Sequence, residues 1–300
     1  MSTHTSELQY HSRHGTIAML VSLTCFTGNA LLLKVLSSSR HVDPWMSLAF
    51  RAVLGLLVTV VLFAPAGSLE LRRSFQSWLL ASRGILGAIG TAAYYVTIGP
   101  LGAGKATLIG NTWTVFAAIM AAFVLHERLG LVKLGGILLA LFGLGLLTGM
   151  APGTLTQFGQ YEIIALVGAV LAAAVVVVIR QLTRTETSAT IFASQCVYGV
   201  LLAVPIAWMN FTSLNWTDVA LLSAAAMCAT FGQLAMTEGF RYLSVAAGGA
   251  FQVTVPVIIT ICSISLFAET FTTPQVIGSI LVLWGSFQTV VGGRTRKTAA

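Results

Sequence analysis

The stretch ALVGAVLAAAVVVVI, residues 165–179, is apolar without interruption, and LLALFGLGLLTG, residues 138–149, has the same character. Neither stretch alternates as a barrel strand does, so the backbone must satisfy its own hydrogen bonds as helix. A helix needs about 20 apolar residues to cross a hydrocarbon layer roughly 30 Å thick. Stretches of that length recur along the chain, which predicts many membrane spans.

Ten spans are predicted, joined by very short loops. They cover residues 15–36, 44–64, 76–97, 104–125, 131–149, 160–182, 188–208, 217–238, 245–267 and 274–292. The sequence therefore predicts an all-α integral membrane protein of ten transmembrane helices. Too few residues remain outside the spans for an extramembrane catalytic domain.

The composition supports this prediction. Of 300 residues, 16 are Lys or Arg and 9 are Asp or Glu, so 8% are charged while 56% are hydrophobic. A soluble domain carries about 25% charged residues. The composition excludes an ordinary soluble enzyme, a disordered chain and a nucleic-acid-binding domain. The net charge of +7 is scattered along the chain, so no nucleic acid is expected as a partner.

The scattered positive residues predict an orientation. With the N-terminus in the cytoplasm, the inner segments hold Arg13, Arg72, Arg73, Arg128, Lys133, Arg180, Arg184, Arg241, Arg294, Arg296 and Lys297, and the outer segments hold Lys34, Arg40 and Lys105. This bias predicts that both termini are cytoplasmic, in a multi-pass protein of the inner membrane. Residues 1–14 and 294–300 are the predicted tails, and the first apolar run is too long for a signal peptide.

The two halves of the chain are related by an internal repeat. With Glu127 laid over Glu269, Gly136 meets Gly278 and Gly143 meets Gly285, at a period near 142 residues. Each half has five spans, an odd number, so the second copy enters the membrane from the opposite side. The predicted units are residues 15–150 and an inverted copy over residues 151–293.

Three motifs carry a resemblance. They are Pro44-x6-Arg51 in the second span, an acid after the fourth and ninth spans (HERL with Glu127, FAET with Glu269), and glycine-spaced fifth and tenth spans. The chain resembles the drug/metabolite transporter superfamily of the EamA type, and within it the aromatic amino acid exporters. The resemblance implies a central substrate cavity between two bundles, alternating access and no cofactor. The second repeat departs from it, since Ser188 and Gln195 replace the Pro and the Arg.

Polar residues inside the spans are the candidate substrate-binding residues, because an amide or hydroxyl in hydrocarbon is costly unless it meets a cavity or another helix. The predicted set is Asn29, Arg51, Thr91, Tyr95, Thr107, Asn111, Gln195, Tyr198, Gln233 and Gln252. Ordinary bonding between helices is the alternative for each member. Pro256 interrupts the ninth span and is a candidate gate or packing kink.

Two cations fall inside predicted spans, Arg51 and Arg83. Either one is placed to meet a substrate carboxylate or to guard an entrance. The alternatives are that Arg83 extends to the lipid headgroups, which is favoured, and that Arg51 is a structural clamp on helix-end carbonyls. All nine acids fall at helix ends or in loops, so no midplane carboxylate is expected to exchange protons for drug cations.

These features predict an exporter of small amphipathic metabolites, with hydrophobic or aromatic amino acids as the favoured substrates. An exporter of drugs or of sugar and nucleotide-sugar metabolites is the alternative, and a scaffold or intramembrane enzyme is disfavoured. The histidines and the four cysteines have no metal-ligand spacing, so neither a metal nor a catalytic site is expected. The expected partners are a small solute and the lipid bilayer, with the chain as a monomer or a homodimer.

Overall fold

The computed structural model describes residues 2–124, 130–148, 159–182, 185–211, 213–243 and 245–291, and these residues contain helices and no strand. The helices are α1 (Ser2–Ser38), α2 (Pro44–Phe63), α3 (Arg73–Gln76), α4 (Trp78–Leu101), α5 (Ala103–Asn111), α6 (Trp113–Val124), α7 (Leu131–Thr148), α8 (Gln160–Leu182), α9 (Ser188–Met209), α10 (Trp216–Tyr242), α11 (Val245–Phe267) and α12 (Thr273–Val291).

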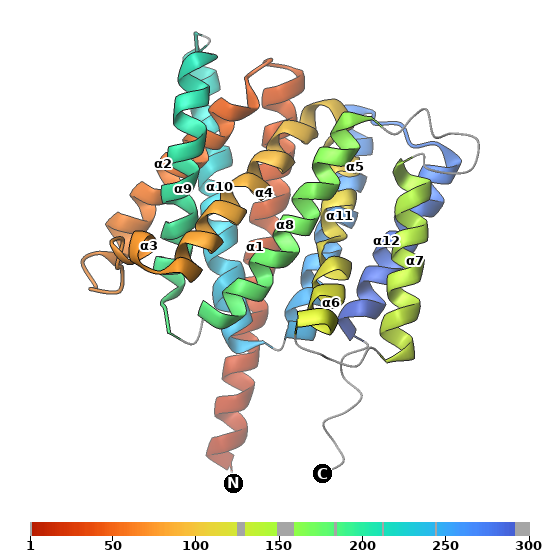
Figure 1. Ribbon diagram of the computed structural model, residues 1–300, viewed down its shortest axis with the longest axis horizontal. Helices are drawn as coiled ribbons and strands as arrows, with labels where there is room; N and C mark the ends of the chain where they lie inside the picture. The colour runs from red at the N-terminus through yellow and green to blue at the C-terminus, as the bar shows by residue number, and fades with distance from the viewer. Residues whose placement is uncertain are drawn as a thin grey trace.

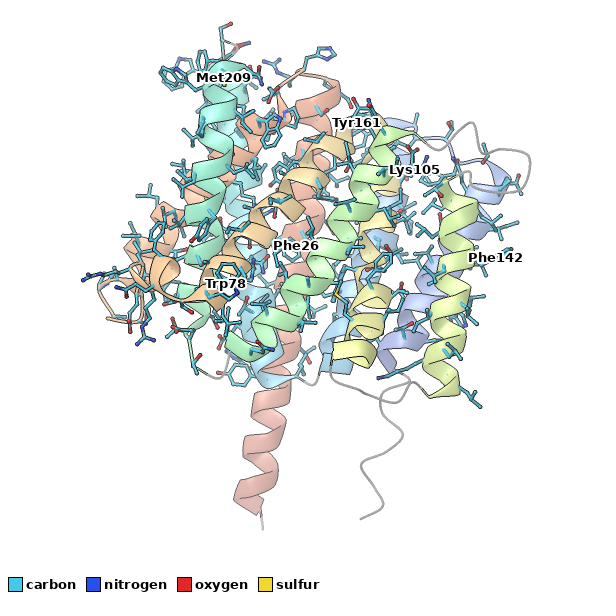
Figure 2. The ribbon with its side chains drawn as sticks, viewed as in Figure 1. Phe26, Trp78, Lys105, Phe142, Tyr161 and Met209 are labelled. Atoms are coloured by element: carbon cyan, nitrogen blue, oxygen red, sulfur yellow. The ribbon has the colours of Figure 1, made fainter. Side chains whose placement is uncertain are left out.

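Eight of the described helices are long and apolar enough to cross a membrane: α1, α2, α4, α7, α8, α9, α10 and α11. The two other predicted spans coincide with α5 followed by α6, and with α12. Large apolar side chains stand on the outside of the bundle, among them Phe142 at the edge formed by α7 (Figure 2). An apolar outer surface and long apolar helices make this a multi-pass membrane protein.

The predicted span 104–125 is not one continuous helix. It divides at Thr112, whose backbone N–H donates to the carbonyl oxygens of Ile109 and Gly110. The Thr112 hydroxyl also donates to the Ile109 carbonyl oxygen, at 2.6 Å. The backbone bond to the third residue back tightens the last turn, and here α5 ends and α6 begins. The apolar pattern hides this break, because both pieces are equally hydrophobic.

Helix starts follow local capping chemistry. Pro44 occupies the first turn of α2, where its missing N–H costs nothing, and Asp43 accepts from the Trp45 N–H at 2.7 Å. The Ser77 and Thr187 hydroxyls cap α4 and α9 in the same way. At the N-terminus, helix α1 already begins at Ser2, so the predicted tail 1–14 is helical over its described residues. The tail 294–300 and Glu127 lie outside the described residues.

The main helix contacts join the two halves of the chain. Helix α2 packs on α9, α5 on α11 and α7 on α12, while α1 packs on α10 and α4 on α8. In the repeat alignment, each of the first three pairs joins a helix to its own counterpart in the other half. The last two pairs are counterparts of each other, because α1 corresponds to α8 and α4 to α10. A pseudo-two-fold axis between the halves, as the inverted repeat predicts, would produce this pattern of pairs. Figure 1 shows the helices as a bundle with α7 and α12 at one edge and α2 and α9 at the other.

Glycines let α7 and α12 approach closely. A Cβ placed on Gly136 would lie 2.8 Å from the Gly285 carbonyl oxygen, and one on Gly143 would lie 2.7 Å from that of Gly278. Such distances leave room for no side chain at all. The small-residue faces of the predicted fifth and tenth spans are therefore used within one chain, where they pack on each other.

Candidate functional site

A cavity of about 280 Å³ lies where α1, α2, α4, α5, α6, α8, α10 and α11 meet. Its polar lining residues are Asn29, Arg51, Thr97, Thr107, Asn111, Gln233 and Gln252. Aromatic side chains complete it, namely Phe26, Tyr94 and Trp113. Figure 2 shows Phe26 near mid-height of the bundle, with Lys105 above it and Trp78 to the left, slightly below it. A mixed lining of aromatic groups and a few amides is typical of a site for a small organic solute.

The cavity gathers many of the side chains that the sequence singled out. Asn29, Arg51, Thr107, Asn111, Gln233, Gln252 and Pro256 all line it. Helix α11 continues through Pro256, so the proline faces the cavity without ending the helix. Whether any of these residues binds a substrate stays a prediction.

Tyr95 lies directly behind this lining. Its hydroxyl donates to the Asn29 Oδ1 atom at 3.3 Å, and the Arg51 guanidinium carbon lies 5.7 Å from the centre of its ring. A cation over an aromatic face is held by the quadrupole of the ring. Tyr95 therefore orients both Asn29 and Arg51 without lining the cavity itself.

Three predicted residues fall elsewhere. Thr91 and Gln195 line a second, much smaller cavity of about 10 Å³, which also borders Arg51. Tyr198 borders neither cavity; its hydroxyl donates to the Ser74 carbonyl oxygen at 3.2 Å, and its ring packs on Phe75. The position of Tyr198 gives its predicted role no support, because α9 turns this residue toward the α3 segment.

Arg83 overturns a sequence expectation. Its side chain is 2% exposed and its Nη2 donates to the Gln195 Oε1 atom at 2.9 Å, so it does not extend to the headgroups. Glycines permit this burial: a Cβ on Gly84 would lie 2.9 Å from the Ser194 carbonyl oxygen of α9, and one on Gly87 would collide with the Arg83 guanidinium. Because α9 covers α4 so closely, the arginine has no path to the surface.

Arg51 is a cation beside the main cavity, and no opposite charge among the described residues is paired with it. Among the described residues it forms no ion pair. Asn111, which is 5% exposed, lines the same cavity and its Nδ2 has no hydrogen-bond partner in the described part of the chain. Buried donors and charges without partners are costly, so both groups are prepared for an acceptor supplied by a solute.

Other polar lining groups are already engaged. The Tyr94 and Thr107 hydroxyls lie 2.9 Å apart, and the Gln252 Nε2 donates to the Ser22 hydroxyl at 3.4 Å. Within the described ranges, no three His, Cys, Asp or Glu side chains gather as a metal site. The chemistry of the cavity is therefore recognition by hydrogen bonds, aromatic faces and one guanidinium.

Sequence reasoning missed one wall of the cavity. Small residues of α8, Ala165, Gly168, Ala169 and Ala172, line that wall. Their spacing of three to four residues places them on one helix face, and that spacing was the available signal. Phe26 carried no signal, since an aromatic residue in an apolar span is unremarkable in the sequence. Tyr94 and Trp113 are likewise aromatic residues inside predicted spans, a feature too general to assign them to the cavity.

Charged pairs close one end of the bundle, the end that carries Lys105. There the Lys105 Nζ lies 2.8 Å from Glu162 Oε1, and the Lys34 Nζ lies 3.6 Å from Glu269 Oε1. Arg40 donates to Asp218 at 2.6 Å, a hydrogen bond that raises the pKa of the Arg40 guanidinium above its ordinary value. Each of these pairs joins the first half of the chain to the second.

Comparisons with known proteins agree with this architecture. The sequence model of the EamA-like transporter family matches residues 13–149 and 160–291. Two curated relatives, both named pseudopaline exporter CntI, come from Pseudomonas aeruginosa strains UCBPP-PA14 and PAO1. Each is 27% identical over 232 residues, which cover 76% of this chain and 78% of the relative.

A solved crystal structure has a similar fold. It superposes with a TM-score of 0.62 at 20% identity, covering 91% of this chain and 96% of the other. At that identity the likeness concerns the fold alone. Together with the family match, it accounts for the helical bundle.

Proposed function

Since the chain belongs to the EamA-like transporter family, and is thus a transporter and not an enzyme, we propose that it exports small amphipathic metabolites bearing a carboxylate. Hydrophobic and aromatic amino acids are the favoured class. The proposed setting is the inner membrane, with ten spans, both termini in the cytoplasm and alternating access between two inverted halves. The pseudopaline exporters support export of a small metabolite, without indicating this substrate class.

The observation that carries the proposal is Arg51 at the cavity without an ion pair among the described residues. A charge near the middle of a bilayer costs about 2.5–3.5 kcal/mol on insertion scales, so it is retained where it serves a partner. Guanidinium groups bind carboxylates through paired, charge-assisted hydrogen bonds. A substrate carboxylate is therefore the ligand that best fits this position.

The rest of the lining suits the apolar part of the same solute. Phe26, Tyr94 and Trp113 offer aromatic faces, and the α8 wall is made of glycine and alanine. The volume of about 280 Å³ is near the lower limit of roughly 300–1,000 Å³ that is typical of ligand pockets. Such a space favours a compact solute over a nucleotide sugar.

Counterflow into liposomes that contain the purified protein tests the proposal. Liposomes loaded with unlabelled phenylalanine or leucine should accumulate the labelled amino acid, and empty liposomes should not. Phenylalaninamide, which lacks the carboxylate, should compete poorly. Arg51→Gln should weaken phenylalanine binding roughly 10- to 100-fold. The exposed Arg72→Gln removes the same charge outside the spans and should behave as the native protein.

Two outcomes would reject this substrate class. The first is equal competition by phenylalanine and phenylalaninamide, which would mean that Arg51 does not distinguish a carboxylate from an amide. The second is movement of a cationic drug or a nucleotide sugar with no counterflow of any amino acid, which would favour the alternative exporter class.

A further inference from the structure

Arg83 is a second cation inside the bundle that the proposed function leaves unused. The side chain is 2% exposed, and its Nε and Nη1 atoms have no hydrogen-bond partner among the described residues. Its Nη2 bonds a neutral amide, that of Gln195. No carboxylate in the described part of the chain forms an ion pair with it. Donors that are buried and unsatisfied to this extent indicate an acceptor that is not part of the protein.

Gln195 occupies the position that such an acceptor would take. Its Oε1 accepts from Arg83 at 2.9 Å, while its Nε2 donates to the Thr91 hydroxyl at 2.9 Å and to the Gly87 carbonyl oxygen at 3.2 Å. A carboxamide and a carboxylate have nearly the same shape. The Gln195 oxygen thus stands where an anionic oxygen would bind, and it accepts only one of the five hydrogen bonds that a guanidinium can donate.

A small cavity joins this position to Arg51. It is lined by Arg51, Thr91 and Gln195, and its volume of about 10 Å³ is roughly that of one water molecule. Arg51 borders both this space and the main cavity, whereas Arg83 lines neither and lies behind Gln195, to which it is hydrogen-bonded.

We infer that Arg83 is an anion-binding subsite behind Gln195, and that a small anion, a carboxylate or a halide, displaces the Gln195 carboxamide to occupy it. The inference rests on the proposed function in one respect, since it adds a second anionic group to the solute that Arg51 binds. The source of that group is either the same solute, which is then a dicarboxylate, or a separate small anion bound with it. In both cases the ligand chemistry is an oxygen anion or halide against a guanidinium.

Thermal unfolding of the purified full-length protein tests the subsite without requiring transport. The melting temperature is measured in sodium HEPES of constant ionic strength with added succinate, acetate or chloride. Gln195→Ala removes the competing amide and should strengthen the anion response about tenfold or more. Gln195→Glu places a permanent carboxylate beside Arg83 and should abolish the response. Gln181→Ala and Gln181→Glu, at an exposed position of α8, are the matched controls and should respond as the native protein.

The size of the response to each added anion identifies whether the anionic group belongs to the transported solute or to a separate anion. A response to succinate that exceeds the response to acetate assigns the subsite to a second carboxylate of one solute, whereas equal responses to acetate and chloride assign it to a separate anion. The subsite is rejected when no anion stabilises the native protein, or when the two Gln195 variants respond alike. Failure of phenylalanine counterflow with an intact anion response would reject only the proposed amino acid substrates.

Discussion

The Lys105 ammonium of α5 lies 2.8 Å from the Glu162 carboxylate of α8, and this pair joins the two halves of the chain at one end of the bundle. Both side chains are largely buried, at 17% and 8% exposure. Glu162 also accepts from the Gly159 N–H at 3.1 Å, so the carboxylate both caps the start of α8 and holds α5. By the charge bias of the loops, this is the predicted outer end.

Breaking that pair should favour the conformation that is open at the outer end. Lys105→Gln removes the attraction and leaves the carboxylate partly buried, which costs about 1–3 kcal/mol in the closed state. A cysteine introduced at the outer end should react faster with an impermeant thiol reagent in this variant. The exchanged double variant Lys105→Glu with Glu162→Lys should recover most of the native rate. Identical rates in the native and single-variant proteins would mean that the pair does not hold the outer end closed.

Gly102 should tolerate no side chain. It has φ +86° and ψ 155°, a conformation that only glycine adopts readily, and a Cβ there would lie 2.6 Å from the Glu269 carboxylate. That carboxylate accepts from the Ala103 N–H at 2.9 Å and the Gly104 N–H at 3.2 Å, which caps α5. Gly102→Ala should destabilise the protein by about 3 kcal/mol or more, measured by thermal unfolding in detergent.

Gly67 distinguishes the backbone strain at positive φ from the collision with Glu269, the two causes of the expected destabilisation by Gly102→Ala. It also has positive φ, +65°, yet a Cβ there meets nothing within 4 Å. Gly67→Ala should therefore cost only about 1–2 kcal/mol of backbone strain. Equal losses in Gly67→Ala and Gly102→Ala would show that contact with Glu269 contributes nothing.

Sequence patterns predicted the helices well because a helix that crosses lipid must be long and apolar, and both properties are visible in a single sequence. They failed where the outcome depends on which helices touch. Arg83 was expected at the headgroups, but Gly84 and Gly87 let α9 cover it. The repeat alignment places Gln195 opposite Arg51 and says nothing of the bond that Gln195 accepts from Arg83 of another helix. The break at Thr112 is a local change of backbone bonding, in which the Thr112 N–H donates to the Ile109 carbonyl oxygen three residues back, and hydrophobicity does not report it.

The packing of α7 on α12 should depend on Gly143. A Cβ at this position would lie 2.6 Å from the Leu281 Cβ and 2.7 Å from the Gly278 carbonyl oxygen, and neither atom can move independently of the helix. Gly143→Ala should destabilise the protein by about 1–3 kcal/mol in thermal unfolding. Gly145→Ala lies on the same helix, where a Cβ meets nothing within 4 Å, and should be neutral or slightly stabilising. Equal effects at the two positions would contradict the observed close approach.

Removal of the cavity amides should reduce transport while leaving the fold intact. Asn111→Leu replaces a buried amide whose Nδ2 has no partner in the described residues, so the variant loses no internal hydrogen bond from that atom. Its melting temperature should stay near the native value or rise, because an unsatisfied buried donor has been replaced by an apolar group. Counterflow of phenylalanine should fall roughly tenfold, since one hydrogen bond to the solute is lost in a desolvated site. Gln233→Leu, on the other wall of the cavity, should have a similar effect, and the exposed Gln181→Leu should have none.

Native transport rates in both Asn111→Leu and Gln233→Leu would show that the cavity amides do not contact the solute, and the binding site would then have to be sought elsewhere in the bundle.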